Sequence, residues 1–431
     1  MQKKDSEERL LLTSMHSMTT KLEKTTYISV LLFAFTLPLS KSAISFFLLW
    51  FFVLLLYKKE FKESLAIIKS SSIFPYMALF LSYMCLSLLW SEDIKEGLNQ
   101  MRLYGYWLLV LPYMIVLVKK EWLERMIDAF LLGMFVSEIL AYGIFFDIWS
   151  INGRTPEYPS PFMTHIHYSV FLAFTSILLL HKVLSKNFTL YAKLPYLIFF
   201  LISTTNLMFS IGRTGQLAFF TALGVLIFLK QRVSLKSLLI TFVSIAAIFL
   251  LAYNSLNLFE QRVKFAKDDI EKISNENYHN SFGLRIIYWY ITLEALKEQP
   301  LLGSGIGDYI VESKKVLQSQ DYGLNEEAKK FLTDHHYHNQ YLMIAVQGGL
   351  IGLLLMFLMF LHFFKLKIKN SEFKEISILG FVIILISFIA EPLWILQFPN
   401  TLFLFITSIS IVASKDDSDI ILKTKERTTD E

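Results

Sequence analysis

Three segments of the sequence carry Arg or His side chains in surroundings that suit chemistry on a phosphate group. In the first, SIGRTGQ, Arg213 stands between two glycines directly before an apolar run. A guanidinium beside the free amide groups of a helix N-terminus is typical of a site for an anion such as phosphate. From this loop alone, an Arg that reaches out to lipid headgroups is an equally good interpretation.

The second segment, GLRIIYWY, places Arg285 ahead of Trp289 in a stretch with the pattern of an amphipathic helix. We expect this helix to end at Pro300, before a turn marked by glycines at 303, 305 and 307. The aromatic residues favour either a place at a substrate site or the anchoring of the helix at the membrane surface.

The third segment, DHHYHNQY, groups His335, His336 and His338 just ahead of an apolar run. A neutral imidazole, whose ordinary pKa is about 6.5, is a natural general base near pH 7. A zinc site is an alternative, but the spacing lacks the His-x-x-x-His pattern of one helical face and there is no Cys partner. Polar capping of a helix start is a third interpretation.

Apolar helices must position these residues. The chain has 431 residues, of which 54% are apolar and 18% charged, which is far more apolar than an average soluble domain. Runs of about the length that crosses a ~30 Å hydrocarbon core recur along it. We therefore expect an all-α integral membrane protein with about 12 transmembrane helices. Their expected positions are residues 27–40, 42–57, 73–90, 105–118, 127–149, 165–181, 194–210, 216–230, 237–255, 341–364, 376–391 and 400–414.

The expected organisation places one large loop late in the chain. Helices 1–9 occupy residues 27–255, the loop occupies residues 256–340 between the ninth and tenth helices, and helices 10–12 occupy residues 341–414. The segment 1–26 has no apolar core or cleavage site of a signal peptide. The tail 415–431 is a solvated end of mixed charge.

The distribution of Lys and Arg predicts the orientation of these helices. Of the 41 basic residues, 26 fall in the two ends and in alternate connections, whereas the short connections on the other side hold 5. Positive charge is retained on the cytoplasmic side, so we expect both termini to be cytoplasmic. Arg154, Arg213 and the large loop are then external.

Composition and the positions of charged residues also argue against three other kinds of protein: one held by disulfides or a cysteine metal site, one that binds nucleic acid, and a transporter. The single Cys85 lies in an apolar run, which rules out an internal disulfide framework and a cysteine metal site. The net charge of +4 is too small to predict nucleic-acid binding. A transporter would place ionisable residues near the bilayer centre, where this sequence offers mainly Glu138, which more often pairs with a neighbouring helix.

Taken together, these segments resemble the bacterial O-antigen ligase family, membrane glycosyltransferases of the O-antigen ligase and polymerase superfamily. The family shows an Arg in a short periplasmic turn, as at Arg213 in GRTG. It shows a second Arg ahead of a Trp in a large periplasmic loop, as at Arg285 and Trp289, followed by a turn like Pro300-Leu-Leu-Gly303.

The family also shows a His followed by Asn, Ser or Gln and, further on, a Gly, as in His338, Asn339 and Gly349. Gly352 departs from the hydroxyl residue that some ligases carry. The resemblance covers most of the chain as topology: many helices, cytoplasmic ends and one large periplasmic loop late in the sequence.

The resemblance implies transfer of O-antigen polysaccharide from undecaprenyl diphosphate to lipid A-core at the periplasmic face of the bacterial inner membrane, which completes lipopolysaccharide. It implies no metal or other cofactor. By its motifs, Arg213 and Arg285 would bind the donor diphosphate, and His338 would accept the proton of the acceptor hydroxyl.

Four further residues are candidate substrate contacts: Asn339, Tyr341, Trp289 and Arg154. Arg154, together with His165 and His167 of the same external loop, would contact the phosphates of the acceptor. The nearest alternative function is an O-antigen polymerase, which uses the same donor with a lipid-linked glycan as acceptor. An oligosaccharyltransferase acting on protein and a polysaccharide or solute transporter are more distant alternatives.

Overall fold

The computed structural model describes residues 20–185, 189–231, 234–255 and 278–415, with a few isolated residues between 260 and 271. These described residues form helices and connections and contain no strand, so the predicted all-α class is confirmed. Most of the segment 1–26, nearly all of the tail 415–431 and the first part of the large loop lie outside the described residues.

Each of the 12 expected apolar runs contains a helix. In chain order these helices are α2 (Lys21–Thr36), α3 (Lys41–Tyr57), α5 (Phe74–Leu86), α6 (Ile94–Leu117), α7 (Leu123–Phe145), α8 (His165–Leu184), α9 (Leu190–Phe209), α10 (Arg213–Gln231), α11 (Leu235–Ser255), α16 (Gln340–Phe364), α17 (Ser371–Ser387) and α18 (Gln397–Ser414). The short helix α4 (Phe61–Ser70) was not expected. The large loop adds α13 (Ser281–Glu298), α14 (Tyr309–Ser319) and α15 (Glu326–Asp334).

Six helices of the described chain are long and apolar enough to cross a membrane, and a bent pair, α3 with α4, brings the number to seven if it is one span. The six are α7 with the short turn before it, α8, α9, α10, α16 and α18. Several of the other expected spans are short helices or carry polar ends. The chain is thus a membrane protein, while the count of about 12 spans stays a prediction.

The bundle is built around α8 and α18, whose residues are mostly buried by neighbouring helices. Helix α10 packs against both α8 and α17, and α16 packs against α5. Aromatic rings fill the centre, where Trp107 of α6 contacts Trp394 and Phe403. Asn400 joins the same helices, because it accepts a hydrogen bond from the Trp107 indole at 2.8 Å and donates one to the Leu103 carbonyl at 2.8 Å.

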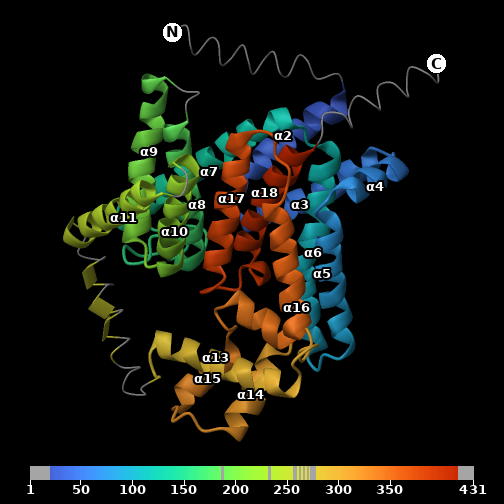
Figure 1. Cartoon of the computed structure of the whole chain (residues 1–431), viewed down its shortest axis with the longest axis vertical. Coiled ribbons are helices and arrows are strands. Elements are labelled where there is room, and N and C mark those ends of the chain that lie inside the picture. Colours follow the sequence, from blue (N-terminus) through green and yellow to red (C-terminus); the bar gives the residue numbers. More distant parts are fainter. Residues whose placement is uncertain are drawn as a thin grey trace.

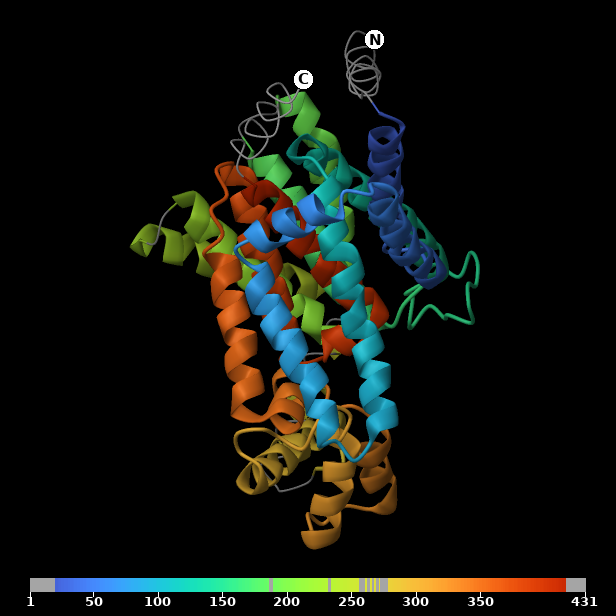
Figure 2. The ribbon, with the colours of Figure 1, turned by 90° about the vertical axis from the view of Figure 1, so that its right-hand side faces the viewer.

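The two ends of the bundle differ (Figure 1). Helices α13, α14 and α15 lie together at one end, and α5, α6 and α16 extend toward them (Figure 2). At the other end, Lys119 after α6 pairs with Glu23 of α2, and Lys415 after α18 donates to the carbonyl of Val118. The described start and end of the chain therefore share the end opposite α13–α15.

Asp308 fastens the α13–α15 segment to the bundle. Its carboxylate accepts hydrogen bonds from the Ser91 hydroxyl and from the backbone N–H groups of Glu92 and Asp93, at 2.7–2.9 Å. These donors precede and begin α6, where free amide groups favour a negative charge. The interaction joins positions more than 200 residues apart.

Helix α16 is interrupted at Gly349, where φ is 60° and ψ is −160°. The turn after α13 enters this break: the N–H groups of Leu350 and Ile351 donate to the carbonyls of Pro300 and Leu301. Gly303 also has a positive φ of 69°, and a Cβ atom there would lie 2.5 Å from the Gly349 nitrogen. Only glycine allows two backbones to approach this closely.

The predicted end of α13 is confirmed, whereas the exposed side of the helix also carries large apolar side chains, those of Phe282, Trp289, Tyr290 and Leu293. The helix begins after Asn280, whose side chain accepts a hydrogen bond from Gly283, and it ends at Glu298, two residues before Pro300. Its buried residues recur every three or four positions, from Gly283 to Ala295, so one face packs against α16 and α14 and the other is exposed.

Candidate active site

His338 and Glu391 form the polar centre of the site. Nδ1 of His338 lies 3.0 Å from Oε2 of Glu391, which follows α17 and is 3% exposed. His338 immediately precedes the N-cap of α16 and has a positive φ of 47°. Such a backbone conformation is uncommon outside glycine and persists only where the surroundings hold it.

Two more imidazoles lie close to the Glu391 carboxylate. Nε2 of His167, in the first turn of α8, lies 3.6 Å from its Oε1 atom, and Nε2 of His336 lies 3.7 Å from the same atom. Burial by itself raises the pKa of this carboxyl, but the interactions with His167 and His338 outweigh it and hold the pKa of Glu391 well below its usual range. The group is therefore a carboxylate near neutral pH.

His336 is held neutral. Burial, partly offset by the negative charge of Glu391, lowers its pKa to about 4. Its Nδ1 atom accepts the backbone N–H of His338 at 3.3 Å, so the ring proton lies on Nε2 and faces Glu391. The positive φ at His338 shapes this short turn, in which the two imidazole rings meet at 4.4 Å.

The pairing with Glu391 leaves the second ring nitrogen of His338 available. A carboxylate only accepts hydrogen bonds, so Nδ1 of His338 carries the proton and Nε2 presents a lone pair. The ring is stacked 6.0 Å from that of Phe331 and is only partly buried. This is the arrangement of a general base oriented by a third group.

Arg213 is the first residue of α10. Glycines flank it because α10 approaches α8 closely: a Cβ atom at Gly212 would lie 2.2 Å from the Ser169 hydroxyl oxygen, and one at Gly215 would lie 2.1 Å from the Ser169 carbonyl oxygen. The start of α10 therefore lies beside the start of α8, from which His167 reaches Glu391.

Arg285 lies on α13, where its guanidinium donates to the Ser281 hydroxyl at 3.3 Å. One turn further on, the Tyr288 hydroxyl lies within 3.4 Å of the carbonyls of Phe331 and His335. Helix α13 thus packs against the segment that leads into His338. Contacts through α8, Glu391 and the segment before His338 link the elements that carry the three predicted site residues, and the convergence of their side chains stays a prediction.

The other candidate contacts have roles within the chain. Asn339 caps α16 by accepting from the Leu342 N–H at 3.1 Å, and it donates to the Ile389 carbonyl at 3.0 Å. Tyr341 donates to the Leu385 carbonyl at 2.7 Å. Both residues join the start of α16 to the end of α17, so they position His338 against Glu391.

The remaining two candidates, Trp289 and Arg154, lie in different surroundings. The side chain of Trp289 is 51% exposed on α13. Arg154 donates to the Met163 carbonyl at 3.2 Å and so braces the connection between α7 and α8. Contact of either residue with a substrate stays a prediction.

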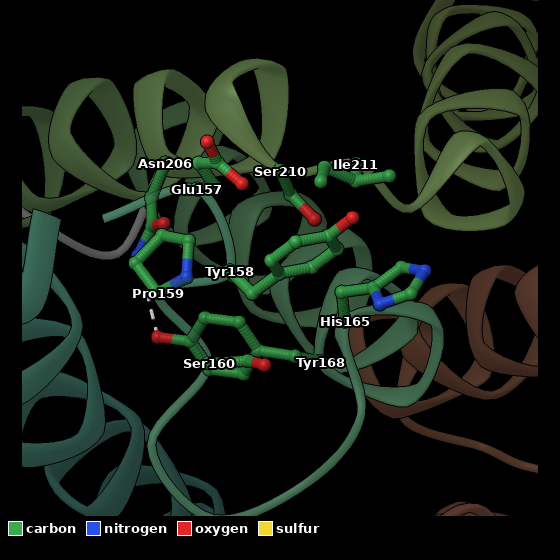
Figure 3. A pocket seen from close by; sticks show the side chains of 9 residues that line it. All are labelled: Glu157, Tyr158, Pro159, Ser160, His165, Tyr168, Asn206, Ser210 and Ile211. Atoms are coloured by element: carbon green, nitrogen blue, oxygen red, sulfur yellow. Dashed lines mark hydrogen bonds between the residues drawn. The ribbon is translucent and has the colours of Figure 1, made fainter. Parts of the chain in front are cut away.

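A small hollow with room for about one water molecule lies between that connection, the end of α9 and the starts of α8 and α10 (Figure 3). Tyr158, His165 and Tyr168 supply rings, and Tyr168 accepts a hydrogen bond from Asn206 at 3.3 Å. Ile211, two residues before Arg213, completes the lining on the side of α10. A hollow of this size with polar groups in its lining suits an ordered solvent molecule and is too small for a sugar ring.

Sequence reasoning missed Glu391 and the role of His167. The signal for Glu391 was present, because it is the single charged residue in a long apolar stretch, ISILGFVIILISFIAEPLWILQF. A charge isolated in this way within a membrane protein marks a functional site by default. His167 was assigned to the acceptor's phosphates, whereas the structure places it against the Glu391 carboxylate.

The fold and the site define a helical membrane protein with a carboxylate-oriented histidine at one end of its bundle. Residues 198–357 match the model of a family described as O-antigen ligase. This stretch contains Arg213, Arg285 and His338, and the sequence resemblance is confirmed there. The match extends from α9 into α16.

A second comparison finds an uncharacterized protein of Haemophilus influenzae that is 31% identical over 240 residues. The aligned stretch covers 52% of this chain and 58% of that relative. The chain therefore spans less than two thirds of the length of this relative, and its similarity to the O-antigen ligase family lies in its central part.

Proposed function

We propose that this protein is an O-antigen ligase that transfers O-antigen polysaccharide from undecaprenyl diphosphate to lipid A-core at the periplasmic face of the bacterial inner membrane. The observation that carries the proposal is the orientation of His338 by Glu391, with its other ring nitrogen available. The family match over the same part of the chain supports the class of donor.

In the proposed reaction, Nε2 of His338 accepts the proton of an acceptor sugar hydroxyl as that oxygen attacks the anomeric carbon of the donor. The bond from that carbon to the diphosphate breaks, and its electron pair leaves with the diphosphate. Glu391 stabilises the imidazolium that forms and fixes the tautomer of the ring. Attack opposite the leaving group inverts the configuration of the sugar carbon.

Arg213 and Arg285 would stabilise the departing diphosphate. Each guanidinium can donate a pair of N–H bonds to phosphate oxygens, and charge that develops in the transition state is where such donors act most strongly. The position of Arg213 at the first residue of α10 adds the free amide groups of that helix. In this proposal no metal or other cofactor takes part.

The orientation in the membrane follows from the basic residues, which favour cytoplasmic termini. In this orientation the α13–α15 end of the bundle, with His338, faces the periplasm, and the remaining expected apolar helices complete about 12 spans. A lipid-linked donor can bind at this end of the bundle, because the diphosphate of such a donor lies at the periplasmic membrane surface.

Two other functions use parts of the same site. An O-antigen polymerase would use the same base and donor with a lipid-linked glycan as acceptor. A transporter is less favoured, because Glu138 is buried and accepts a hydrogen bond from Ser203 of α9 at 2.5 Å, as expected for a helix pair.

A deletion distinguishes the ligase from the polymerase. Loss of a ligase leaves long chains on the undecaprenyl carrier, whereas loss of a polymerase leaves lipid A-core that carries one repeat unit. In the deletion strain, the wild-type gene should restore laddered lipopolysaccharide and His338→Ala should not, because loss of a general base costs about 10²- to 10⁴-fold in rate. Ladders at wild-type level from His338→Ala would refute the role of His338.

A further inference from the structure

We propose that His336, His338 and Glu391 form a binding site for a transition-metal dication of the Zn²⁺ type, and that occupancy of this site inhibits transfer. The inhibition of transfer rests on the proposed function, whereas the binding of the metal ion does not. In the part of the chain that the structure describes, these three residues offer ligand atoms that all lie within 4.8 Å of one another.

The donor set fits such an ion. Zn²⁺ takes imidazole nitrogens and carboxylate oxygens at about 2.0–2.2 Å, so tetrahedral ligand atoms lie roughly 3.3 Å apart by geometry. The distance from His338 Nδ1 to Glu391 Oε2 is 3.0 Å, and that from His336 Nε2 to Glu391 Oε1 is 3.7 Å. Small side-chain movements would bring all three to coordination distance and leave a fourth position for water.

The surroundings of the three ligands also fit. His167 lies 3.6 Å from Glu391 Oε1, where it can orient the carboxylate as outer groups do at metal sites. Ligation by Nε2 of His336 moves its ring proton to Nδ1, which opens the contact of 3.3 Å from the His338 N–H. Metal binding therefore requires the His336 ring to turn, so that its Nδ1–H no longer faces the His338 N–H.

Inhibition follows from which nitrogen of His338 faces the ligand cluster. A metal ion on Nδ1 requires the imidazole proton on Nε2, and Nε2 is the atom proposed to accept the proton of the acceptor hydroxyl. A metal-bound His338 therefore has no lone pair for the reaction. The ion would also neutralise the carboxylate that stabilises the imidazolium.

Binding is tested on the full-length, tag-free protein in nanodiscs, by titration with ZnCl₂ in competition with a chromogenic chelator. We expect one Zn²⁺ per chain and a loss of affinity of at least about tenfold in His336→Ala. The matched control is His335→Ala, because His335 is exposed, lies next to His336 and directs its Nδ1 to the Phe331 carbonyl at 3.1 Å. Equal affinities in wild type, His336→Ala and His335→Ala would overturn the site.

CoCl₂ gives a second readout that does not depend on affinity, because four-coordinate Co²⁺ has intense visible bands. These bands should appear with wild type and His335→Ala and be absent with His336→Ala. Thermal unfolding of all three proteins without metal checks that each is folded. Absence of the bands from wild type would overturn the proposed coordination.

Inhibition is tested by transfer from the lipid-linked donor to lipid A-core, with each variant compared to its own rate in chelator. We expect ZnCl₂ to inhibit wild type and His335→Ala at the concentrations that saturate binding, and to need at least about tenfold more for His336→Ala. Inactivation by chelator that zinc reverses would overturn the inhibitory role. No transfer by wild type under any condition would contradict the proposed function and leave the binding result standing.

Discussion

Nδ1 of His338 lies 3.0 Å from Oε2 of Glu391, although α16 and α17 separate the two residues in the chain. Two further imidazoles, those of His167 and His336, approach the other oxygen of this carboxylate. The relationship makes Glu391 a positioning residue for His338, because it sets both the orientation of the ring and the nitrogen that carries the proton.

Glu391→Gln should test this role. The amide keeps the shape of the side chain but loses the charge that stabilises the imidazolium, so we expect the turnover number kcat to fall by about 10²-fold or more, with a small change in KM. Transfer to lipid A-core by purified protein measures both constants. Glu391→Asp should recover part of kcat, and equal rates for Glu391→Gln and wild type would show that the pair has no part in the reaction.

Arg285→Lys separates charge from geometry. Lysine keeps the positive charge but cannot donate a planar pair of N–H bonds, so we expect a marked loss of transfer, of about tenfold or more. Arg102→Lys is the control, since Arg102 lies on α6 and bonds within that helix to Asn99. Full activity of Arg285→Lys would indicate that Arg285 anchors α13 at the membrane surface.

Gly349→Ala should destabilise the folded protein, because the backbone conformation at this position disfavours a side chain. At φ 60° and ψ −160° a side chain costs about 1–3 kcal/mol, and the new Cβ atom would lie 2.3 Å from the Leu301 carbonyl oxygen. Gly323→Ala is matched, because its φ is 66° but no atom lies within 4 Å of the added Cβ. Thermal unfolding in detergent should show a larger decrease in Tm for Gly349→Ala, and equal decreases would contradict the close approach.

Glu312→Gln should stabilise the protein near neutral pH. Burial raises the pKa of Glu312, in spite of its hydrogen bond from Lys315. Between the ordinary pKa and the raised one, the folded protein binds more protons than the unfolded chain, so stability decreases as the pH rises through this window. Glutamine removes the penalty, and Lys315 keeps Glu92 as a partner at 2.7 Å.

We expect Glu312→Gln to raise Tm at pH 7 by about 1–2 °C, with a difference that shrinks as the pH approaches 4. Glu326→Gln serves as the control, because Glu326 is exposed and pairs with Lys329 within α15. Scanning calorimetry at a series of pH values measures the effect. A difference in Tm that grows toward low pH would have the wrong sign for this account.

Local features of the chain were predictable from sequence. Apolar runs located all 12 expected helices, because burial in lipid or in a bundle requires continuous apolar surface that composition reveals directly. Pro300 and the glycines that follow it predicted the end of α13 and the turn after it. The Arg and His segments of the family resemblance were likewise visible as short motifs, and the match over residues 198–357 confirmed that resemblance.

Other features depended on packing between distant parts of the chain. The pairing of His338 with Glu391 requires α16 and α17 to bring their ends together, and the break at Gly349 is stabilised by carbonyl groups of Pro300 and Leu301. Hydropathy treated α16 as one uninterrupted run. It also predicted about 12 spans, whereas six of the described helices, or seven with the bent pair, are long and apolar enough to cross a membrane.

The sequence by itself determined where helices form, which side chains have suitable chemistry and which family motifs they match, because these properties belong to short stretches of chain. Only the tertiary structure decided which of these side chains meet. A hydrogen bond or a carboxylate–imidazole pair depends on distances of about 3 Å, and such distances are set by the packing of whole helices against one another.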